Sequence, residues 1–136
     1  MLRRSLNSVE VRFFKADYRG ILAKLKEYAE KLVEERGVRA VILVGSLARG
    51  DFTAFSDADV VVVSDQEPRR LIDRISKYID PSLPIDVEPR VYTSAELLRM
   101  SRERSKLVEE IIKYGRLLAG DPQILDAVKR VFGGSS

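Results

Sequence analysis

Two short aliphatic segments constrain most strongly what this chain can fold into. Residues 38–44 and 60–63 consist almost entirely of Val, Ile, Leu and Ala, with no regular alternation of apolar and polar positions. A strand that is apolar on both faces has to be covered on both faces, which is typical of a central strand in a sheet packed between helices. We therefore expect both segments to be central strands of a helix-covered sheet.

Segments with helical periodicity surround these strands. The strongest begins at Asp17, a good N-cap residue, and ends at Gly37, with apolar residues every three or four positions between them. Thr93 and Glu96 form the signature of a capping box, so another helix should begin there and continue or restart towards Gly115. The helices expected from these patterns lie within residues 17–37, 68–80, 93–115 and 121–132.

A third strand is expected over residues 84–92, where Ile85, Val87 and Val91 alternate with polar residues. Pro89 cannot donate a backbone hydrogen bond to a neighbouring strand, so this strand should lie nearer an edge of the sheet. The resulting order is helix, strand, strand, helix, strand and helices. It predicts an α+β protein with a small mixed β-sheet flanked by helices.

The 136 residues allow one domain, which we place at residues 17–132. Residues 1–16 are ambiguous, because the alternation of apolar and polar residues over 9–13 fits either a short edge strand or an N-terminal arm. The Gly-Gly-Ser-Ser sequence at 133–136 is expected to be a frayed, disordered tail.

The chain contains no histidine, cysteine or tryptophan. Catalytic triads and dyads that use histidine or a thiol are therefore excluded, and so is a zinc site with nitrogen or sulfur ligands. What remains is the chemistry of carboxylates, hydroxyls, Lys, Arg and the backbone. A bound metal should accordingly be a hard cation held by oxygen atoms, such as Mg²⁺, Mn²⁺ or Ca²⁺.

The net charge of +3 is modest and does not by itself indicate a nucleic-acid ligand. No apolar run is long enough to span a bilayer and no signal-peptide core follows the first residues, so we expect a cytoplasmic protein that makes no membrane contact. Arg outnumbers Lys 16 to 8, a third of the residues are charged, and Asn and Gln together number three. This composition is typical of a protein from a thermophile.

One polar, glycine-containing segment has the features of a binding site. It follows the first central strand as Gly45-Ser46 and ends with Asp57 and Asp59 at the beginning of the second. Gly45 lets the backbone approach a ligand closely, and Ser46 with the following amides would open a short helix whose N-terminus favours an anion. Asp57 and Asp59 are two apart on an extended segment, so both carboxylates point the same way and can hold one cation. A phosphate site beside a metal site indicates a nucleoside triphosphate or a similar polyphosphate as the ligand.

The spacing Gly-Ser, ten residues, Asp-x-Asp resembles the signature of the DNA polymerase beta-type nucleotidyltransferase superfamily. Gly45-Ser46 with Asp57 and Asp59 matches that spacing without adjustment, and the Ala-Arg-Gly-Asp that follows resembles the fuller form found in the minimal nucleotidyltransferase branch. The resemblance extends over residues 17–120 and implies the palm-like nucleotidyltransferase fold.

The resemblance also implies roles for these residues. Gly45 and Ser46 would hold the triphosphate, while Asp57 and Asp59 would hold two Mg²⁺ ions, with Mn²⁺ as an alternative. One metal ion would activate the nucleophile and the other would stabilise the leaving pyrophosphate.

The family needs a third carboxylate on a neighbouring strand. Asp86 lies between two apolar residues, as in the family's pattern, and would complete the metal site and help to deprotonate the attacking hydroxyl. Glu88, on the same face of the strand, is the rival candidate. Arg49 would either reach a phosphate oxygen or form a structural ion pair with Asp51.

The reaction implied by the resemblance moves a nucleoside monophosphate, AMP from ATP in the first instance, to a hydroxyl of a protein or a small-molecule acceptor. Members of the minimal branch often pair with a small helical HEPN-type protein and act as its antitoxin by modifying it.

Nucleic acid is not expected as a partner, because the chain leaves no room for the extra domains with which polymerases hold it. The alternative function is a non-catalytic binding module that neutralises a helical partner by contact. A homodimer through the C-terminal helices is also compatible with their amphipathic faces.

Overall fold

The computed structural model describes residues 17–53, 56–66 and 71–134. Its centre is a four-stranded sheet in the order β3-β2-β1-β4. The strands are β1 (Ala40–Val44), β2 (Ala58–Val63), β3 (Val87–Tyr92) and β4 (Arg116–Gly120). β1 is antiparallel to β2 and to β4, whereas β2 and β3 are parallel, so the predicted mixed sheet of an α+β protein is confirmed.

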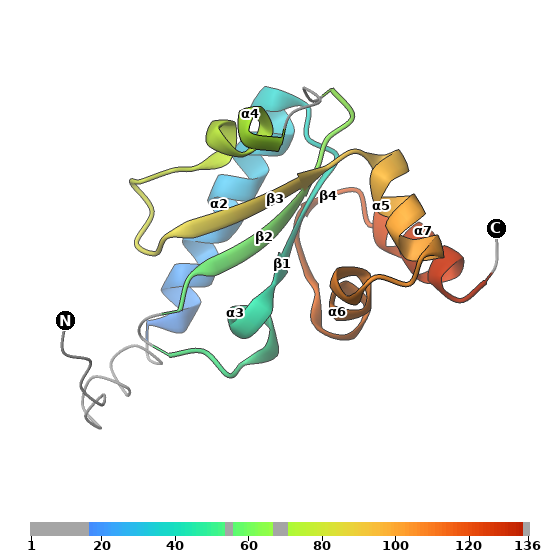
Figure 1. Ribbon diagram of the computed structural model, residues 1–136. Helices are drawn as coiled ribbons and strands as arrows, with labels where there is room; N and C mark the ends of the chain where they lie inside the picture. The colour runs from blue at the N-terminus through green and yellow to red at the C-terminus, as the bar shows by residue number, and fades with distance from the viewer. Residues whose placement is uncertain (1–16, 54–55, 67–70, 135–136) are drawn as a thin grey trace.

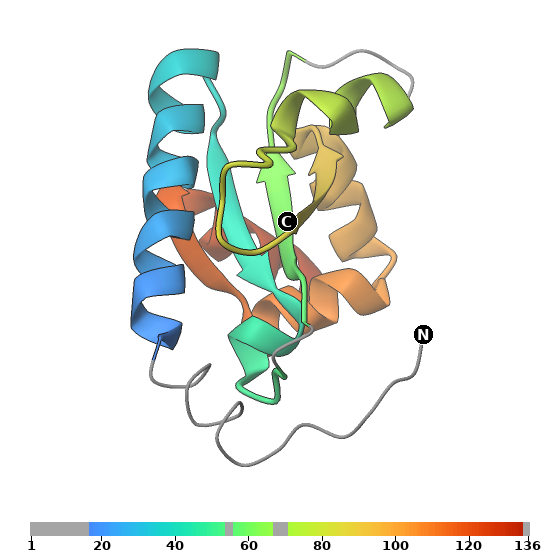
Figure 2. The same ribbon diagram turned by 90° about the vertical axis from the view of Figure 1, so that its left-hand side faces the viewer.

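Helices cover both faces of this sheet, as Figures 1 and 2 show. Alternate residues of β1 and β2 contribute to two separate apolar cores, one on each face. Every residue of β1 is buried, and in β2 only Asp59 is partly exposed, which confirms that both aliphatic segments are central strands. α2 (Tyr18–Arg36) covers one face, and the other is covered by α5 (Ser94–Arg102), α6 (Lys106–Tyr114) and α7 (Gln123–Phe132).

The first expected helix is α2, and it ends where the sequence predicts. Gly37 follows it with a left-handed φ of +68°. The predicted cap at Asp17 is wrong, because its carboxylate makes no capping hydrogen bond within the described part of the chain. Asp17 has φ −93° and ψ 2°, not the extended backbone from which an N-cap side chain reaches back to the first turn.

The capping box at the start of α5 is confirmed. Thr93 Oγ1 accepts a hydrogen bond from the Glu96 N–H at 3.1 Å, and Glu96 Oε1 accepts one from the Thr93 N–H at 2.9 Å. The helical pattern then restarts instead of continuing, because Arg104 adopts a left-handed φ of +56°. Ser105 caps α6 by accepting a hydrogen bond from the Val108 N–H at 3.3 Å.

The two remaining predicted helices are present in shorter form. The helix expected over 68–80 is α4 (Leu71–Ile75) followed by the 3₁₀ turn η1 (Ser76–Tyr78), and residues 68–70 lie outside the described part. α7 begins one residue after Pro122, and Asp121 Oδ1 accepts a hydrogen bond from the Gln123 N–H at 2.9 Å.

The sequence patterns do not predict β4. It is five residues long, and a bulge between Val41 and Ile42 of its partner strand interrupts the alternation of its side chains. So short and irregular a strand carries little periodicity. Its end is set by Gly120, which has φ +107° and where a Cβ atom would lie 2.3 Å from the backbone oxygen of Arg39.

The proposed N-terminal arm at 1–16 lies outside the described residues, whereas Gly133 and Gly134 of the proposed tail form a turn after α7. Helices α2 and α7 begin and end close to the limits of the proposed domain at 17–132, which stays a prediction. Among the described residues, no helix combines the length and the apolar character that crossing a bilayer requires.

Candidate active site

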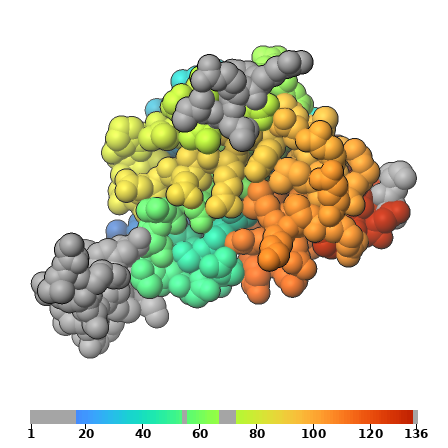
Figure 3. Space-filling model, in the orientation of Figure 1, coloured from blue at the N-terminus to red at the C-terminus, as the bar shows by residue number. Residues whose placement is uncertain are grey.

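The sheet topology brings the motif residues together at one end of the strands. β1 and β2 are antiparallel, so the last residue of β1, Val44, is paired with Asp59 near the start of β2. β3 is parallel to β2 and therefore also starts at this end. The short helix α3 (Gly45–Arg49) follows β1 directly. On the surface in Figure 3, α3 and its following loop (green) lie between residues 80–92 (yellow) and α6 (orange).

The carboxylate of Asp59 lies directly against the backbone of Gly45. A Cβ atom built at Gly45 would be 2.3 Å from Asp59 Oδ2 and 3.1 Å from its Cγ, and Gly45 has a left-handed φ of +74°. No other residue type fits both the space and this backbone conformation. The structure thus brings the glycine of the Gly-Ser motif against the second acid of the Asp-x-Asp motif.

A pair of serine hydroxyls links the two halves of the motif a second time. Ser46 Oγ donates a hydrogen bond to Ser56 Oγ at 3.1 Å, and Ser56 Oγ also accepts one from the Thr53 N–H at 2.9 Å. Ser56 immediately precedes Asp57, so these bonds hold the entrance of β2 close to the start of α3. The hydroxyl groups of Ser46 and Ser56 therefore connect the start of α3 to the residue that precedes Asp57.

Two other acidic side chains, Glu88 and Asp57, act electrostatically on Asp59. Its pKa is raised above the ordinary value, first by partial burial, then by the negative charge of Glu88 and, more weakly, by that of Asp57, while Arg90 opposes the shift. Asp59 and Glu88 are partners in register on neighbouring parallel strands, so their side chains lie on the same face of the sheet. A group of carboxylates that repel each other in this way is a favourable place for a cation.

The two candidates for the third carboxylate are placed differently. Glu88 lies on β3 opposite Asp59, and its charge is among those that act on Asp59. Asp86 precedes β3, has an exposed side chain, and contacts β2 through its backbone, where its carbonyl accepts a hydrogen bond from the Ala58 N–H at 2.8 Å. The structure therefore brings Glu88, the rival, closer to Asp59, and the assignment of Asp86 stays a prediction.

Arg49 is held by two carboxylates. Its Nε donates to Asp51 Oδ2 at 3.2 Å, and its Nη1 donates to Glu110 Oε2 at 2.9 Å. The hydrogen bond to Asp51, with the charges of both acids, raises the pKa of Arg49 further above its already high value. The structural ion pair of Arg49 with Asp51 is present, and a contact of Arg49 with a phosphate oxygen stays a prediction.

Glu110 is a residue of this site that the sequence does not indicate. It lies on α6, and besides Arg49 its Oε2 binds the backbone N–H of Gly45 at 2.7 Å. The two contacts span 65 and 61 residues of the chain. A glutamate on the polar side of an amphipathic helix carries no local signal for such a contact.

The donor set fits a hard divalent cation better than any other metal. In the described part of the chain, no three acidic side chains lie close enough together to form a ready-made metal site. Asp57, Asp59 and Glu88 nevertheless offer only oxygen atoms, and a cation would relieve the repulsion that raises the pKa of Asp59. Asp57 and Asp59, with Asp86 or Glu88 as the third carboxylate, are the residues that would hold it.

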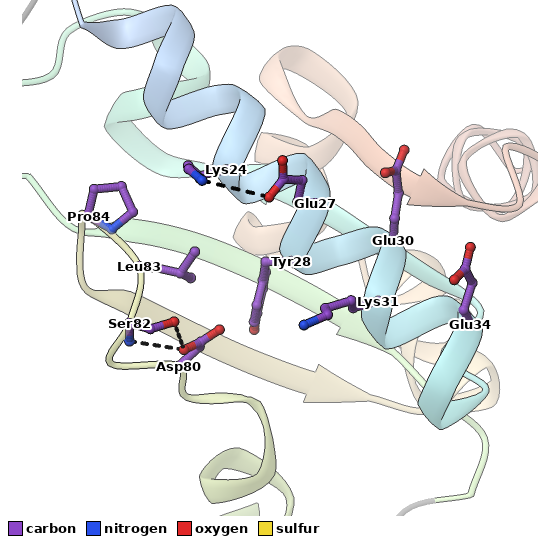
Figure 4. Close-up of a pocket in the computed structure, with 10 residues that line it drawn as sticks. All are labelled: Lys24, Glu27, Tyr28, Glu30, Lys31, Glu34, Asp80, Ser82, Leu83 and Pro84. Atoms are coloured by element: carbon purple, nitrogen blue, oxygen red, sulfur yellow. Dashed lines mark hydrogen bonds and ion pairs between the residues drawn. The ribbon is translucent and has the colours of Figure 1, made fainter.

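A hollow of about 630 Å³ lies elsewhere on the molecule, between α2 and residues 80–84. Figure 4 shows that Tyr28 points into it and that acidic and basic side chains of α2 surround it. None of the residues lining it belongs to the Gly-Ser or Asp-x-Asp motif. The chemistry of the motif is therefore at the end of the strands and not in this hollow.

Comparisons with known sequences show which family this chain resembles. The sequence model of the family described as "Nucleotidyltransferase domain" matches residues 22–118, which include the whole motif. A protein of Methanocaldococcus jannaschii, whose name proposes that it is a protein adenylyltransferase, is 39% identical over 96 residues. That alignment covers 69% of this chain and 93% of the relative.

Solved structures share the fold. A Sulfolobus solfataricus protein, proposed to be a nucleotidyltransferase, has a TM-score of 0.53 at 22% identity, over 75% of this chain and 82% of its own. A chain from a toxin–antitoxin structure with AMP-PNP has a TM-score of 0.54 at 19% identity, over 79% of this chain and 86% of its own. Since the family model covers most of the chain and includes the residues that the structure assembles, the chain belongs to the nucleotidyltransferase domain family and is a nucleotidyltransferase.

Proposed function

We propose that the protein transfers AMP from ATP to a hydroxyl group of a protein acceptor, with the help of divalent cations. The observation that carries this proposal is the contact of Asp59 with Gly45, because it joins an acidic cluster to a phosphate-binding turn. The relative from M. jannaschii, whose name proposes protein adenylyltransferase activity, supports AMP as the group and a protein as the acceptor.

The reaction needs one bond to form and one to break. The acceptor oxygen attacks the α-phosphorus of ATP, the bond between the α-phosphorus and its bridging oxygen breaks, and pyrophosphate leaves. The proton of the acceptor hydroxyl passes to a carboxylate of the acidic cluster. Such a transfer depends mainly on positioning and on neutralising charge, for which neither histidine nor cysteine is required.

The residues of this chain divide the work between them. Gly45 and Ser46 hold the phosphates: Gly45 lets the ligand approach its backbone closely, and Ser46 offers its hydroxyl at the start of α3, while the Gly45 N–H itself is bound by Glu110. Asp57, Asp59 and a third carboxylate, for which Glu88 is better placed than Asp86, hold the cations and receive the proton. Two Mg²⁺ ions, with Mn²⁺ as an alternative, would neutralise the triphosphate and polarise the attacking hydroxyl when bound.

Calorimetric titration with ATP in the presence and absence of Mg²⁺ tests the site. We expect Mg²⁺-dependent binding by the parent protein, and loss of it in Asp57→Asn and in Asp59→Asn. Asp126→Asn is the matched control, since Asp126 is an exposed aspartate on α7. Binding of ATP by both motif variants as tightly as by the parent would show that the metal assignment is wrong.

Labelled ATP tests the transfer itself. The protein is incubated with Mg²⁺, a lysate of its own source and ATP labelled either at the α- or at the γ-phosphate. Transfer of AMP predicts a protein band that carries the α label only. A γ-labelled band would indicate phosphoryl transfer, and the absence of any labelled band with an active ATP-binding site would point to the binding module.

A partner protein is the natural acceptor within this proposal. The fold is shared with a chain of a toxin–antitoxin structure, which supports a partner protein; that the partner is a small helical protein of the HEPN type, modified by this protein as the antitoxin, follows from the resemblance to the minimal branch. Co-expression separates modification from simple contact. If the double variant Asp57→Asn/Asp59→Asn still silences the partner, binding alone is sufficient for silencing. If the double variant still forms the complex but no longer silences the partner, nucleotidyl transfer is required.

A further inference from the structure

One oxygen atom of Glu110 contacts both ends of the motif helix α3. Glu110 Oε2 accepts hydrogen bonds from the backbone N–H of Gly45 at 2.7 Å and from Nη1 of Arg49 at 2.9 Å. Gly45 is the first residue of α3 and Arg49 is the last. A side chain from a distant helix therefore spans the whole phosphate-binding turn.

Helix α3 needs such a contact because it cannot stabilise itself. It has five residues, about one turn, and isolated helices of that length do not persist in water. Its N-cap position is Val44, which has no polar side-chain atom with which to accept a hydrogen bond from the first turn. The carboxylate of Glu110, on α6, takes the place of the missing N-cap side chain and accepts the hydrogen bond of the Gly45 N–H.

Glu110 is held in place by the packing of its own helix. Its neighbours Val108 and Ile111 are buried in the core between α6 and the sheet, so α6 is a firm support. The Glu110 side chain is only 26% exposed. Arg49 is fixed from its other side by Asp51, at 3.2 Å from Nε. The guanidinium is thus clamped between two acids, one of which also binds Gly45.

We propose that Glu110 is a positioning residue of the nucleotide site, which holds α3 in the geometry that receives the triphosphate. This inference rests on the proposed function. In it Glu110 touches neither the nucleotide nor the reacting atoms and acts through Gly45 and Arg49. Its loss should weaken the binding of ATP more than it alters the overall stability of the fold.

The test compares three variants with the parent. Glu110→Ala removes both hydrogen bonds, whereas Glu110→Gln keeps an oxygen that can still accept from the Gly45 N–H. Glu109→Ala is the matched control, because Glu109 is the exposed neighbour on the same helix and its ion pair is with Lys113. For each protein the Kd for ATP with Mg²⁺ is measured by calorimetry, together with the thermal midpoint and the amide exchange rate of Gly45 without nucleotide.

We expect Glu110→Ala to raise the Kd for ATP about tenfold, as lost hydrogen bonds to a charged group would, and to speed exchange of the Gly45 amide by a similar factor. Glu110→Gln should recover part of both effects, and Glu109→Ala should match the parent.

A Kd in Glu110→Ala equal to that of the parent overturns the inference, and a lower Kd overturns it too, because it would show that Glu110 competes with phosphate. Should Glu110→Ala fail to fold, the partial effect in Glu110→Gln still decides. A parent that binds no ATP overturns the proposed function and the inference with it, so the two failures are distinguishable.

Discussion

Asp59 Oδ2 lies so close to Gly45 that a Cβ atom at position 45 would be only 2.3 Å away from it. Because of this contact, the space for a side chain at the turn that begins α3 is already taken by an acid of the neighbouring strand. The turn and the acidic cluster therefore behave as one unit, and a change on either side should disturb both.

Replacement of Gly45 by alanine tests this unit. Gly45→Ala should abolish Mg²⁺-dependent ATP binding, because the new methyl group displaces the Asp59 carboxylate and the φ of +74° disfavours alanine. Gly37→Ala is the control: it has a similar φ of +68° but nothing within 4 Å of its Cβ position. In both variants backbone strain should lower the free energy of unfolding by about 1 kcal/mol, but only Gly45→Ala should lose ATP binding in calorimetry.

The choice between the two candidates for the third carboxylate leads to a second prediction. Glu88→Gln should lower the rate of nucleotidyl transfer by about 10²-fold or more, because Glu88 is paired in register with Asp59 and its negative charge acts on that carboxylate. Asp86→Asn should retain most of the activity. Rates are compared at saturating ATP and Mg²⁺, after thermal unfolding has shown that both variants are folded. The opposite order of effects would restore the assignment to Asp86.

The stability of the fold should depend on pH through Glu96. Its pKa lies below the ordinary value, first because of the hydrogen bond from the buried Arg74, at 2.8 Å, and then because of the Thr93 N–H. A carboxyl group with a lowered pKa in the folded state stabilises the protein above its unfolded pKa, and this contribution is lost as the pH falls through the folded value.

Glu96→Gln should therefore be less stable than the parent at pH 7 by about 2 kcal/mol, which corresponds to a fall in the melting midpoint of about 4–8 °C. The difference should shrink as the pH falls below about 5. Glu103→Gln, an exposed acid at the end of the same helix, is the control. A difference between Glu96→Gln and the parent that stays constant from pH 7 to pH 3 would contradict the assigned role of the ion pair.

The hydroxyl of Tyr28 should contribute to stability and not to activity. It donates a hydrogen bond to the backbone carbonyl of Tyr78 at 2.6 Å, which ties α2 to η1 across a buried contact. Burial also raises the pKa of Tyr28, so the hydroxyl remains protonated as a donor. Tyr28→Phe should lower the free energy of unfolding by about 1–2 kcal/mol. Tyr114→Phe, at an exposed tyrosine, should leave the melting midpoint unchanged, and ATP binding should be preserved in both variants.

Local sequence patterns predict many of the helices and strands of this molecule. The buried strands β1 and β2, the edge strand β3, the capping box at Thr93 and the end of α2 at Gly37 all depend on residues within a few positions of one another. Side-chain periodicity and helix caps report such short-range relationships directly. The Gly-Ser and Asp-x-Asp motif belongs to the same class, because the antiparallel pairing of β1 with β2 brings together two ends of a single loop.

The sequence by itself therefore determined the fold class and the family, and it predicted a site of hydroxyls and carboxylates whose motif residues the structure brings to one end of the strands. Only the tertiary structure decided that β4 joins the sheet, that Glu88 faces Asp59, and that Glu110 holds Gly45. The register between parallel strands is set by the crossover and the packing of both faces, and the contact of Glu110 spans 65 residues. Relationships of this kind arise when separately formed elements pack against each other, and no pattern within a single element records them.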